Sequence, residues 1–222
     1  MEIRTYPLGP LQANLYVIAF ESDAIIIDPC VAFDKLGLDG INVRGIICTH
    51  SHYDHIVEAE SIRTLTGSIL LAYEDEIRSI LDPDYNSTTP FFPALSISPP
   101  VCGLKDGDVL TARDFEIETK DDFTMKVIHT PGHTKGSMCL LFTFHTPDGV
   151  KKYLFSGDTL FAGSVGRTDI GGSMPDMMNS IQRLSGLPDD ISVLPGHDRA
   201  TTMGYEKRNN PYFTAYKSDD II

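Results

Sequence analysis

The sequence predicts a single domain of the α+β class in which short strands come first and helices are inserted between them. Three observations favour this class. The chain opens with apolar segments of strand length, apolar residues then recur at helical spacing, and strand-like segments return in the second half. No linker divides the chain and no internal repeat is visible, so we expect one domain over residues 1–222. A chain of this length can bury a substantial core.

The first elements are expected to be strands that lead into a helix. Four apolar segments have strand length: residues 3–8, 14–20, 24–28 and 45–48. Apolar residues from Ile56 to Leu65 then recur at the spacing of one helix face, and Gly67 is a natural helix stop. The polar segment just before this helix is therefore predicted to be a strand-to-helix turn, at the edge where α/β proteins usually bind ligands.

The middle of the chain is expected to contain one more strand and helix and then a long loop. Residues 68–72 are predicted to form the strand, and residues 74–81 a helix with an acidic start. Residues 82–102 contain five prolines and the adjacent Phe91 and Phe92. We therefore predict a surface loop there, either a functional lid or a plain insertion.

The second half is predicted to return to strands. The expected strands are residues 108–118, 123–129, 137–144, 151–156 and 191–194. Residues 174–186 have the pattern of a helix. The strand at 151–156 runs into Gly-Asp and the last strand into Pro-Gly-His, so both are expected to end in polar side chains.

The composition indicates a soluble globular protein, with 41% apolar and 22% charged residues. The net charge of −13 repels a polyanion, and no run of Lys and Arg is longer than two, so nucleic acid is not an expected partner. The apolar runs are far too short to cross a membrane, and the N-terminus shows no secretory signal. We therefore expect a cytoplasmic protein without a membrane partner; the sequence does not indicate its oligomeric state.

The cysteines favour a reducing environment. Cys30, Cys48, Cys102 and Cys139 are dispersed and form no CxxC pair. Without an export signal, buried reduced thiols are expected rather than disulfides. Cys48 and Cys139 lie in apolar strand-like runs, where cysteine usually acts as a small hydrophobic residue.

Three of the seven histidines lie in the short segment Thr-His-Ser-His-Tyr-Asp-His, residues 49–55. At the end of an extended strand, residues two apart point the same way, so His50 and His52 can converge on one metal ion. Where the chain turns into the helix, Asp54 and His55 project differently and can reach a second ion. The alternative is a solvated histidine-rich turn without a ligand, which the dense spacing makes the weaker interpretation.

Other loops must complete such a site, and three strand-edge loops offer His133, Asp158 and His197, each beside a glycine that lets a ligand approach. Taken singly, Asp158 could be a turn residue and His197 a surface histidine. His129 is expected to be a structural histidine, and His145 to be exposed in a polar turn. Imidazole and carboxylate ligands favour zinc, iron or manganese, and the lack of cysteine ligands argues against a closed structural zinc site.

Several segments resemble the metallo-β-lactamase-fold hydrolases, in particular short members similar to glyoxalase II (hydroxyacylglutathione hydrolase). The resemblance covers nearly the whole chain. It rests on IDP (27–29), THSHYDH (49–55), HTPGHT (129–134), FSGDTLFAGSVGRTD (155–169) and PGHDRATTMGYEKRNNPYF (195–213). The last two segments are the more diagnostic, because HxHxDH alone also occurs in nucleases, lactonases and dioxygenases.

The resemblance implies an αβ/βα sandwich, a four-layer fold of two mixed sheets face to face with helices outside and metals at one sheet edge. The implied ligands are His50, His52 and His133 for the first ion, Asp54, His55 and His197 for the second, and Asp158 as the bridge between them. The implied cofactors are two divalent metal ions, with zinc as the first expectation and iron or manganese as alternatives.

The implied function is hydrolysis of a small acyl thioester by a hydroxide held between the two ions, which lower the pKa of bound water. A thiol with a pKa of about 8.5 leaves without a strong general acid, which suits this chemistry. Asp54 and Asp158 are the predicted catalytic residues, with Asp54 as a ligand that orients the hydroxide. Full-length glyoxalase II has a helical domain that binds glutathione, and none is visible in this sequence. The resemblance therefore does not predict which thiol carries the acyl group.

Several residues outside the ligand set are candidates for supporting roles. Asp28, at the end of an apolar strand, is predicted either to orient a metal-bound histidine or to form a turn before Pro29. Arg167 could bind a substrate carboxylate, although pairing with Asp169 is the favoured interpretation. The further candidates for substrate contact are Lys207, Arg208, Phe91 and Phe92, with solvated charges and a self-anchored loop as the plainer alternatives.

Three other functions are compatible with the motif. A persulfide dioxygenase of the same fold is an oxidoreductase that holds one iron through two histidines and an aspartate. A nuclease is disfavoured by the acidic charge. A non-catalytic metal-binding protein would explain the histidines but not the intact Asp158. Metal content and a substrate panel would distinguish these functions.

Overall fold

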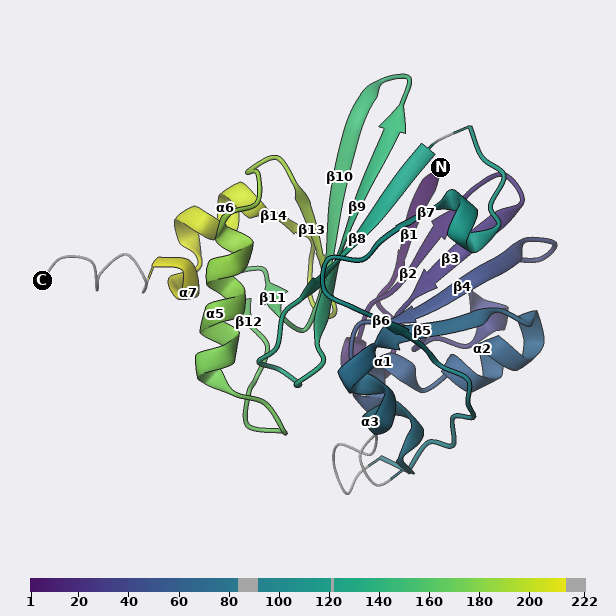
Figure 1. The fold of residues 1–222 in the computed structure, drawn as a ribbon, viewed down its shortest axis with the longest axis horizontal. Coiled ribbons are helices and arrows are strands. Elements are labelled where there is room, and N and C mark those ends of the chain that lie inside the picture. The colour runs from purple at the N-terminus through teal and green to yellow at the C-terminus, as the bar shows by residue number, and fades with distance from the viewer. Residues whose placement is uncertain (84–91, 121, 215–222) are drawn as a thin grey trace, which may run out of the picture.

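Two six-stranded β-sheets face each other, and helices cover their outer faces (Figure 1). The computed structural model describes residues 1–83, 92–120 and 122–214. This arrangement is the predicted αβ/βα sandwich, so the predicted fold class is confirmed.

The first sheet is mixed and has the strand order β1-β2-β3-β4-β5-β6. Its strands are β1 (Glu2–Tyr6), β2 (Leu15–Ala19), β3 (Asp23–Ile27), β4 (Asn42–Cys48), β5 (Ile69–Tyr73) and β6 (Cys102–Leu104). The first three strands pair antiparallel, whereas β3 to β6 pair parallel. The carboxyl ends of the parallel strands therefore meet at one edge of the sheet.

Short helices connect these strands. They are α1 (Tyr53–Ile56), α2 (Ala59–Thr66), α3 (Ile77–Leu81) and the 3-10 helices η1 (Pro10–Gln12), η2 (Phe33–Lys35) and η3 (Glu74–Glu76). The predicted helix stop is confirmed at Gly67, which follows α2 with a φ of +70°. The helix predicted over residues 74–81 is split, because its first three residues form η3 and only the rest is α-helical.

The second sheet is also mixed and has the order β14-β13-β10-β9-β8-β7. Its strands are β7 (Val109–Thr111), β8 (Asp122–His129), β9 (Met138–Thr146), β10 (Gly149–Gly157), β13 (Ser192–Pro195) and β14 (Thr201–Thr202). β10 and β13 pair parallel, and the other neighbours pair antiparallel. A small antiparallel pair, β11 (Leu160–Phe161) and β12 (Ser164–Val165), follows β10.

The outer face of the second sheet carries the C-terminal helices α5 (Met174–Ser185), α6 (Met203–Asn209) and α7 (Pro211–Thr214), as Figure 1 shows. The helix predicted over residues 174–186 corresponds to α5. The helix α6 was not predicted from the sequence, although Thr202 caps it by accepting a hydrogen bond from the Tyr205 backbone N–H.

The strand predicted over residues 108–118 is wrong beyond Thr111. Asp114 accepts hydrogen bonds from the backbone N–H and the hydroxyl of Thr111, at 2.7 and 2.9 Å, and this capping box starts the 3-10 helix η4 (Ala112–Phe115). The apolar alternation arises because Phe115 turns inward and packs against the core phenylalanine Phe123.

Three apolar layers hold the sandwich together. In β2, Leu15 and Val17 pack toward the helices of the first half, whereas Tyr16 and Ile18 face the second sheet. This alternation explains why β2 and β3 are buried along their whole length. Buried side chains of α5 such as Ile181 form the third layer on the outer face of the second sheet.

The four cysteines are free, as predicted, and Cys48 and Cys139 are buried in strands. Cys102 departs from the expectation because it is exposed at the start of β6. In the described part of the predicted long loop, residues 92–101 form neither helix nor strand, although Ile97 packs into the first apolar layer. Among the described residues, none of the helices combines the length and the hydropathy that a membrane crossing requires.

Candidate metal centre

The predicted ligands lie where strands of both sheets end. His50 and His52 follow the carboxyl end of β4, and α1 begins at the next residue and carries Asp54 and His55. The strand-to-helix turn predicted around the histidine segment is therefore present. A turn at the carboxyl ends of parallel strands is a common ligand position in α/β proteins.

The second sheet contributes the other three predicted ligands. His133 lies between β8 and β9, Asp158 follows β10, and His197 follows β13. Because β10 and β13 pair in parallel, their ends bring Asp158 and His197 to the same edge. That edge faces the loop after β4, so both sheets supply side chains to one cluster.

All seven predicted ligands converge in three overlapping groups, in each of which the ligand atoms lie within 4.8 Å of one another. The groups are His50–His52–His133, His50–His55–Asp158 and Asp54–His55–His197. The first and third groups match the two sets implied for two ions, and the middle group joins them.

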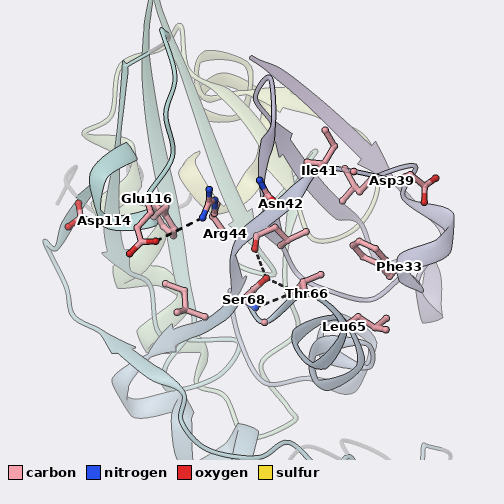
Figure 2. A pocket seen from close by; sticks show the side chains of 16 residues that line it. Phe33, Asp39, Ile41, Asn42, Arg44, Leu65, Thr66, Ser68, Asp114 and Glu116 are labelled. Carbon is pink, nitrogen blue, oxygen red and sulfur yellow. Dashed lines mark hydrogen bonds and ion pairs between the residues drawn. The ribbon is translucent and has the colours of Figure 1, made fainter.

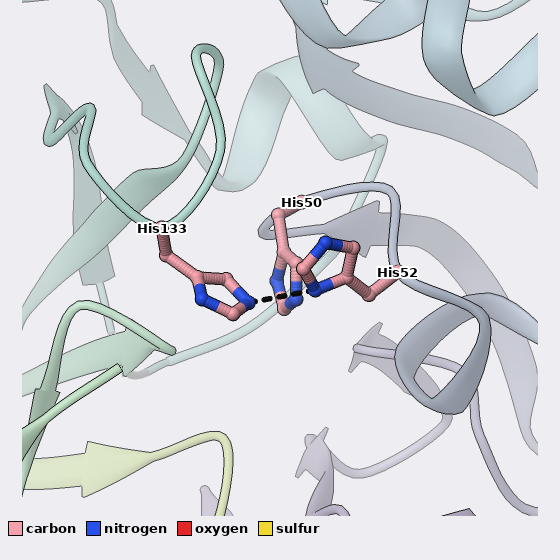
Figure 3. A group of neighbouring side chains, drawn as sticks. All are labelled: His50, His52 and His133. Atoms are coloured by element: carbon pink, nitrogen blue, oxygen red, sulfur yellow. Dashed lines mark hydrogen bonds between the residues drawn. The ribbon is translucent and has the colours of Figure 1, made fainter. Parts of the chain in front are cut away.

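The first group consists of three histidines whose rings point at one another (Figure 3). Nε2 of His133 lies 2.7 Å from Nδ1 of His52, and the centroids of these two rings are 4.3 Å apart. The His50 ring lies 4.8 Å from each of the other two. Three buried imidazole nitrogens thus face a common point, which is the arrangement a metal ion requires.

The second group combines two histidines with a carboxylate. Nε2 of His197 lies 3.2 Å from Nε2 of His55 and 3.2 Å from Oδ2 of Asp54. Burial alone would raise the pKa of Asp54, but the hydrogen bond with His197 and the nearby His55 outweigh burial and lower it to about 2. Asp54 therefore offers an ionised carboxylate oxygen at neutral pH.

Asp158 lies between the two groups. Its Oδ2 is 3.4 Å from Nε2 of His133 in the first group and 3.5 Å from Nε2 of His197 in the second. Its Oδ1 is 3.4 Å from Nε2 of His55. One carboxylate therefore contacts both ligand sets, which is the position predicted for a bridge.

Asp28 fixes the orientation of two of these histidines. Its Oδ2 accepts hydrogen bonds from the Thr49 hydroxyl at 2.9 Å and from Nδ1 of His55 at 3.1 Å. Since the single Thr49 hydroxyl hydrogen goes to Asp28, Thr49 must accept from Nδ1 of His50 at 3.0 Å. In both rings Nδ1 carries a hydrogen, so Nε2 is the atom turned toward the cluster.

A backbone carbonyl does the same for the third histidine. Nδ1 of His133 lies 2.7 Å from the carbonyl oxygen of Arg167, which can only accept, so Nδ1 carries the hydrogen. His133 therefore also turns Nε2 toward the cluster. Such partners orient and stiffen metal-binding histidines in other proteins.

The donor set fits divalent cations. Among the described residues, two buried side-chain polar atoms lack a hydrogen-bond partner, Nε2 of His50 and Oδ1 of Asp158. Both point into the cluster, and leaving such atoms unpaired is costly in a folded protein. A cation between them would satisfy both, and imidazole with carboxylate suits zinc, iron or manganese.

The electrostatics of the cluster also favour a cation. Burial lowers the pKa of His50 well below its usual value and that of His52 to about 3, so both rings are neutral and offer lone pairs. Burial acts in the same direction on His55, but the charges of Asp158 and Asp28 outweigh it and raise the pKa to about 10. The carboxylates thus stabilise a positive charge at the His55 ring, which a bound metal ion can supply in place of a proton.

Close packing around the cluster requires glycine. A Cβ atom on Gly196 would lie 2.2 Å from Oδ1 of Asp158 and 2.7 Å from Cε1 of His55. Gly157 has a φ of +47°, and a Cβ there would lie 2.5 Å from the Thr49 hydroxyl. The prediction that glycines let the ligands approach closely therefore has a direct steric basis.

Sequence reasoning missed Glu76, a buried residue of η3 that links the two loops of the first group. Its Oε1 accepts hydrogen bonds from the backbone N–H of Ser51 at 3.2 Å and its hydroxyl at 3.0 Å. Its Oε2 accepts from the backbone N–H of Gly136 at 3.2 Å. Ser51 separates His50 from His52, so Glu76 holds their loop against the loop of His133.

Glu206 of α6 has the corresponding role in the second half and was also missed. It is fully buried and accepts from the backbone N–H of Gly163 at 2.8 Å and from the Thr201 hydroxyl at 2.7 Å. It thereby ties the loop after Asp158 to the loop after His197. The signal in the sequence was an acidic residue four positions after Thr202, the helix cap.

A cleft of about 300 Å³ opens onto the cluster. Its lining includes five predicted ligands, together with Leu11, Phe92, Phe161, Arg167 and Ile170. A larger cavity of about 590 Å³ lies at the opposite ends of β4 and β5, beside Arg44 and Ser68 (Figure 2). No histidine or cysteine is among the described residues that line this larger cavity, so the smaller cleft is the candidate active site.

The predicted substrate residues have different surroundings. Arg167 lines the cleft, and its guanidinium binds both carboxylate oxygens of Asp169 at 2.6 Å, which is the interpretation that the sequence favoured. Lys207 and Arg208 both pair with Asp189, at 2.8 and 3.4 Å, and are not among the residues that line the cleft. Their proposed substrate contact therefore has no support in the geometry.

The aromatic pair predicted as a lid is described only in part. Phe92 lines the cleft and stacks on Tyr53 of α1, with ring centroids 4.6 Å apart, whereas Phe91 lies outside the described residues. His129 stacks on Tyr73 and bonds to the Lys135 carbonyl oxygen at 2.8 Å, so it is structural, as expected.

His145 is exposed, as expected, although it lies within a strand rather than in the turn. It pairs with Val150 of β10, and the turn itself follows Thr146. The turn between β9 and β10 therefore begins at Pro147, two residues later than the sequence indicated.

The fold and this cluster define the class of protein, and a comparison with known families agrees. Residues 8–197 match the model of the metallo-beta-lactamase superfamily, and the chain belongs to this superfamily. Together with the cluster, the related proteins support a metal-dependent hydrolase.

Relatives cover almost the full chain. An uncharacterized protein of Aquifex aeolicus is 34% identical over 218 residues, which is 96% of this chain and 97% of the relative. The probable metallo-hydrolase YqgX of Bacillus subtilis and the hydroxyacylglutathione hydrolase GloC of Haemophilus influenzae are each 30% identical. Both matches cover 97% of this chain and 99% of the relative.

Two solved structures share the fold along nearly their whole length. The B3 metallo-beta-lactamase BLEG-1 is 32% identical with a TM-score of 0.81, and the match covers 96% of this chain and 100% of BLEG-1. The protein TTHA1623, solved in a di-iron-bound form, is 29% identical with a TM-score of 0.75, covering 94% of this chain and 99% of TTHA1623.

Proposed function

We propose that this protein is a dinuclear hydrolase of small acyl thioesters, a short member of the superfamily similar to glyoxalase II. The position of Asp158 carries the proposal. Its carboxylate contacts His133 of the first ligand group and His55 and His197 of the second at 3.4 to 3.5 Å. A mononuclear site would need only one group, whereas here a complete second group stands beside the first.

The cofactors that fit this donor set are two divalent ions, with zinc as the first candidate and iron or manganese as alternatives. Iron gains support from the related TTHA1623, which has been solved in a di-iron form. When bound, two ions supply Lewis acidity, which lowers the pKa of a water molecule and polarises an acyl carbonyl.

Two carboxylates are the proposed catalytic residues. Asp54 and Asp158 both line the cleft, where a substrate can reach them. Because its pKa is lowered to about 2, Asp54 accepts hydrogen bonds at neutral pH and can orient an attacking water molecule. It cannot donate a proton to a poor leaving group, which favours a substrate whose leaving group departs as an anion.

A thioester meets that requirement, because a thiol with a pKa of about 8.5 leaves as a thiolate near neutral pH. An amide nitrogen would need a proton from a general acid. The relationship to GloC, a hydroxyacylglutathione hydrolase, supports the same substrate class.

The test combines metal analysis with a substrate panel. The purified protein is loaded separately with zinc, iron and manganese, its metal content is measured by mass spectrometry, and each form is assayed with thioesters, lactones and glutathione persulfide. We expect two ions per chain and thioester hydrolysis that Asp54→Asn lowers by at least a hundredfold. The matched control is Asp148→Asn, which changes an exposed aspartate in the turn between β9 and β10, outside the ligand set and the cleft lining.

Three results would overturn the proposal. One iron per chain with oxygen uptake on the persulfide would establish the dioxygenase instead. Two bound ions without turnover of any substrate would indicate a non-catalytic metal-binding protein. Full thioester hydrolysis by Asp54→Asn would remove this carboxylate from the mechanism.

A further inference from the structure

Apolar side chains line the cleft together with the predicted metal ligands. Four apolar side chains line it, each from a different loop or short element, and we call them the apolar collar. The collar consists of Leu11 of η1, Phe92, Phe161 of β11, and Ile170 in the loop before α5. A substrate bound in this cleft is within reach of these side chains.

Leu11 is held at the cleft in an unusual way. Its side chain is 68% exposed, and its backbone adopts the left-handed region with φ +54° and ψ +20°. The following Gln12 also has a positive φ, of +61°. Residues other than glycine, asparagine and aspartate rarely adopt this region, and such strain persists where the surrounding structure fixes it and often marks a functional site.

The surrounding structure does fix it. Just beyond η1, buried Asn14 donates its backbone N–H to the Gly196 carbonyl at 2.7 Å and its side-chain N–H groups to the carbonyls of Pro195 and Asp198 at 2.9 and 3.0 Å. These acceptors flank His197. The loop that carries Leu11 is therefore positioned directly against a loop of the candidate metal centre.

Two other members of the collar are seated on the metal motif itself. Phe92 stacks on Tyr53, which lies between His52 and Asp54, with an interplanar angle of 8°. Phe161 meets the His197 ring edge-on, with centroids 5.9 Å apart. The collar is thus continuous with the ligand cluster, and apolar groups next to the reacting carbonyl would contact it.

The charges around the cleft point to an uncharged substrate. Arg167 alone, among the described residues that line the cleft, carries a fixed positive charge, and its Nε and Nη2 already donate to the two carboxylate oxygens of Asp169. The whole chain carries a net charge of −13. Apart from the proposed metal ions, a thiol that bears free carboxylates, as glutathione does, would find no fixed cation without an ion-pair partner among the described residues of this cleft, and the net charge of the chain would repel it.

We propose that the apolar collar selects acyl thioesters of uncharged, apolar thiols over thioesters of carboxylate-bearing thiols. This inference rests on the proposed thioester hydrolysis and names its substrate class. Specificity then comes from apolar contact with Leu11, Phe92, Phe161 and Ile170 rather than from an ion pair with the substrate.

The test uses one acyl group on three thiols: glutathione, uncharged N-acetylcysteamine and apolar benzyl mercaptan. We measure kcat/KM for each with the metal-loaded protein and expect the benzyl ester to exceed the glutathione ester by at least tenfold. Leu11→Asn keeps a residue that tolerates a positive φ but removes the apolar contact. It should lower the ratio of the two kcat/KM values by about five- to tenfold.

Two further variants sharpen the result. Leu8→Asn is the matched control, since Leu8 is 67% exposed but does not line the cleft, and its kcat/KM ratio should equal that of the wild type. Asp169→Asn releases Arg167 and should shift the ratio toward glutathione by about two- to fivefold. Calorimetry with the unreactive thioethers of the same thiols should give the same order of binding.

The outcomes separate this inference from the function on which it rests. Hydrolysis of all three esters with glutathione equal or preferred would overturn the selectivity and leave thioester hydrolysis intact. An equal effect of Leu8→Asn and Leu11→Asn would also overturn it. If no thioester is hydrolysed by the metal-loaded protein, the proposed function fails and the inference fails with it.

Discussion

Replacement of Asp28 by asparagine exchanges one carboxylate oxygen for an NH2 group. This change should disturb the protonation of the ring nitrogens in two histidines of the candidate metal centre, His50 and His55. The backbone of Asp28 has a φ of +53°, which asparagine also tolerates. Oδ1, which accepts from the Thr49 backbone N–H at 2.8 Å, can remain an oxygen. Oδ2 becomes an NH2 group, which cannot accept from Nδ1 of His55 and donates to the Thr49 hydroxyl instead.

The consequence reaches both ligand groups. With its hydroxyl now accepting from the introduced amide, Thr49 directs its own hydrogen at His50, so that Nδ1 of His50 loses its hydrogen and Nε2 gains one. Nδ1 of His55 loses its hydrogen-bond acceptor directly, because the NH2 group has replaced Oδ2 of residue 28. Loss of such an outer partner costs about 10- to 100-fold in metal affinity, so we expect at least that loss for each of the two ions.

The assay is titration of chelator-treated protein with cobalt, followed by visible absorption and calorimetry. Asp23→Asn is the matched control, because Asp23 is also a buried, hydrogen-bonded aspartate but belongs to a cluster with Arg44 away from the metal centre. Both variants should unfold at lower temperature than the wild type, whereas only Asp28→Asn should weaken cobalt binding.

Two results would refute the reasoning. Cobalt affinities of Asp28→Asn within threefold of the wild type would show that Asp28 does not set the histidine tautomers. An equal loss of affinity in Asp23→Asn would show that general destabilisation, rather than the hydrogen bonds of Asp28, weakens the site.

The remaining predictions concern stability and packing. Glu76→Gln should leave the buried backbone N–H of Gly136 opposite an NH2 group, which lowers the free energy of unfolding by about 1 to 3 kcal/mol and Tm by about 2 to 12 °C. The exposed Glu74→Gln is the control and should leave Tm unchanged in the same thermal scans. Gly196→Ala places a methyl group 2.2 Å from Oδ1 of Asp158, so calorimetry should show at least tenfold weaker metal binding; unchanged binding would mean that the loop relaxes freely. Burial alone would raise the pKa of Asp23, but its hydrogen bonds outweigh burial and lower the pKa below 3.8 in the folded protein. Ionised Asp23 therefore stabilises the fold fully above pH 3.8, and this contribution is lost as the pH falls through the pKa of the folded state. The difference in unfolding free energy between wild type and Asp23→Asn, measured in urea with chelator, should therefore narrow between pH 5 and acidic pH of about 2.

The metal cluster could be predicted from the sequence because its spacing carries geometry. His50 and His52 lie two apart at a strand end, and a helix begins at the next residue, so local rules alone separate them from Asp54 and His55. The core strands could also be predicted from the sequence, since burial on both faces gives β2 and β3 a continuous apolar run of strand length.

Other features could not be predicted, because they depend on tertiary contacts. Nothing in the run Glu74-Asp75-Glu76 shows which acidic side chain turns inward, and only the folded loops make Glu76 an acceptor for Gly136. Leu11 reads as an ordinary exposed leucine until the cleft is assembled around it. The false strand after Thr111 arose because a 3-10 turn that buries Phe115 imitates strand alternation.

The hydrogen bonds from Asn14 to the carbonyls around His197 join the beginning of the chain to the end of β13 and the loop that follows it. During synthesis, a ribosome exposes His50 and His55 more than a hundred residues before His197, so the early histidines emerge as a partial donor set. The full set of donors, and with it full metal affinity, exists only after β13 has docked beside β10 and Asn14 has met its partners. Binding of the second of the two proposed ions would therefore require that the loop of His197 has docked against the rest of the fold.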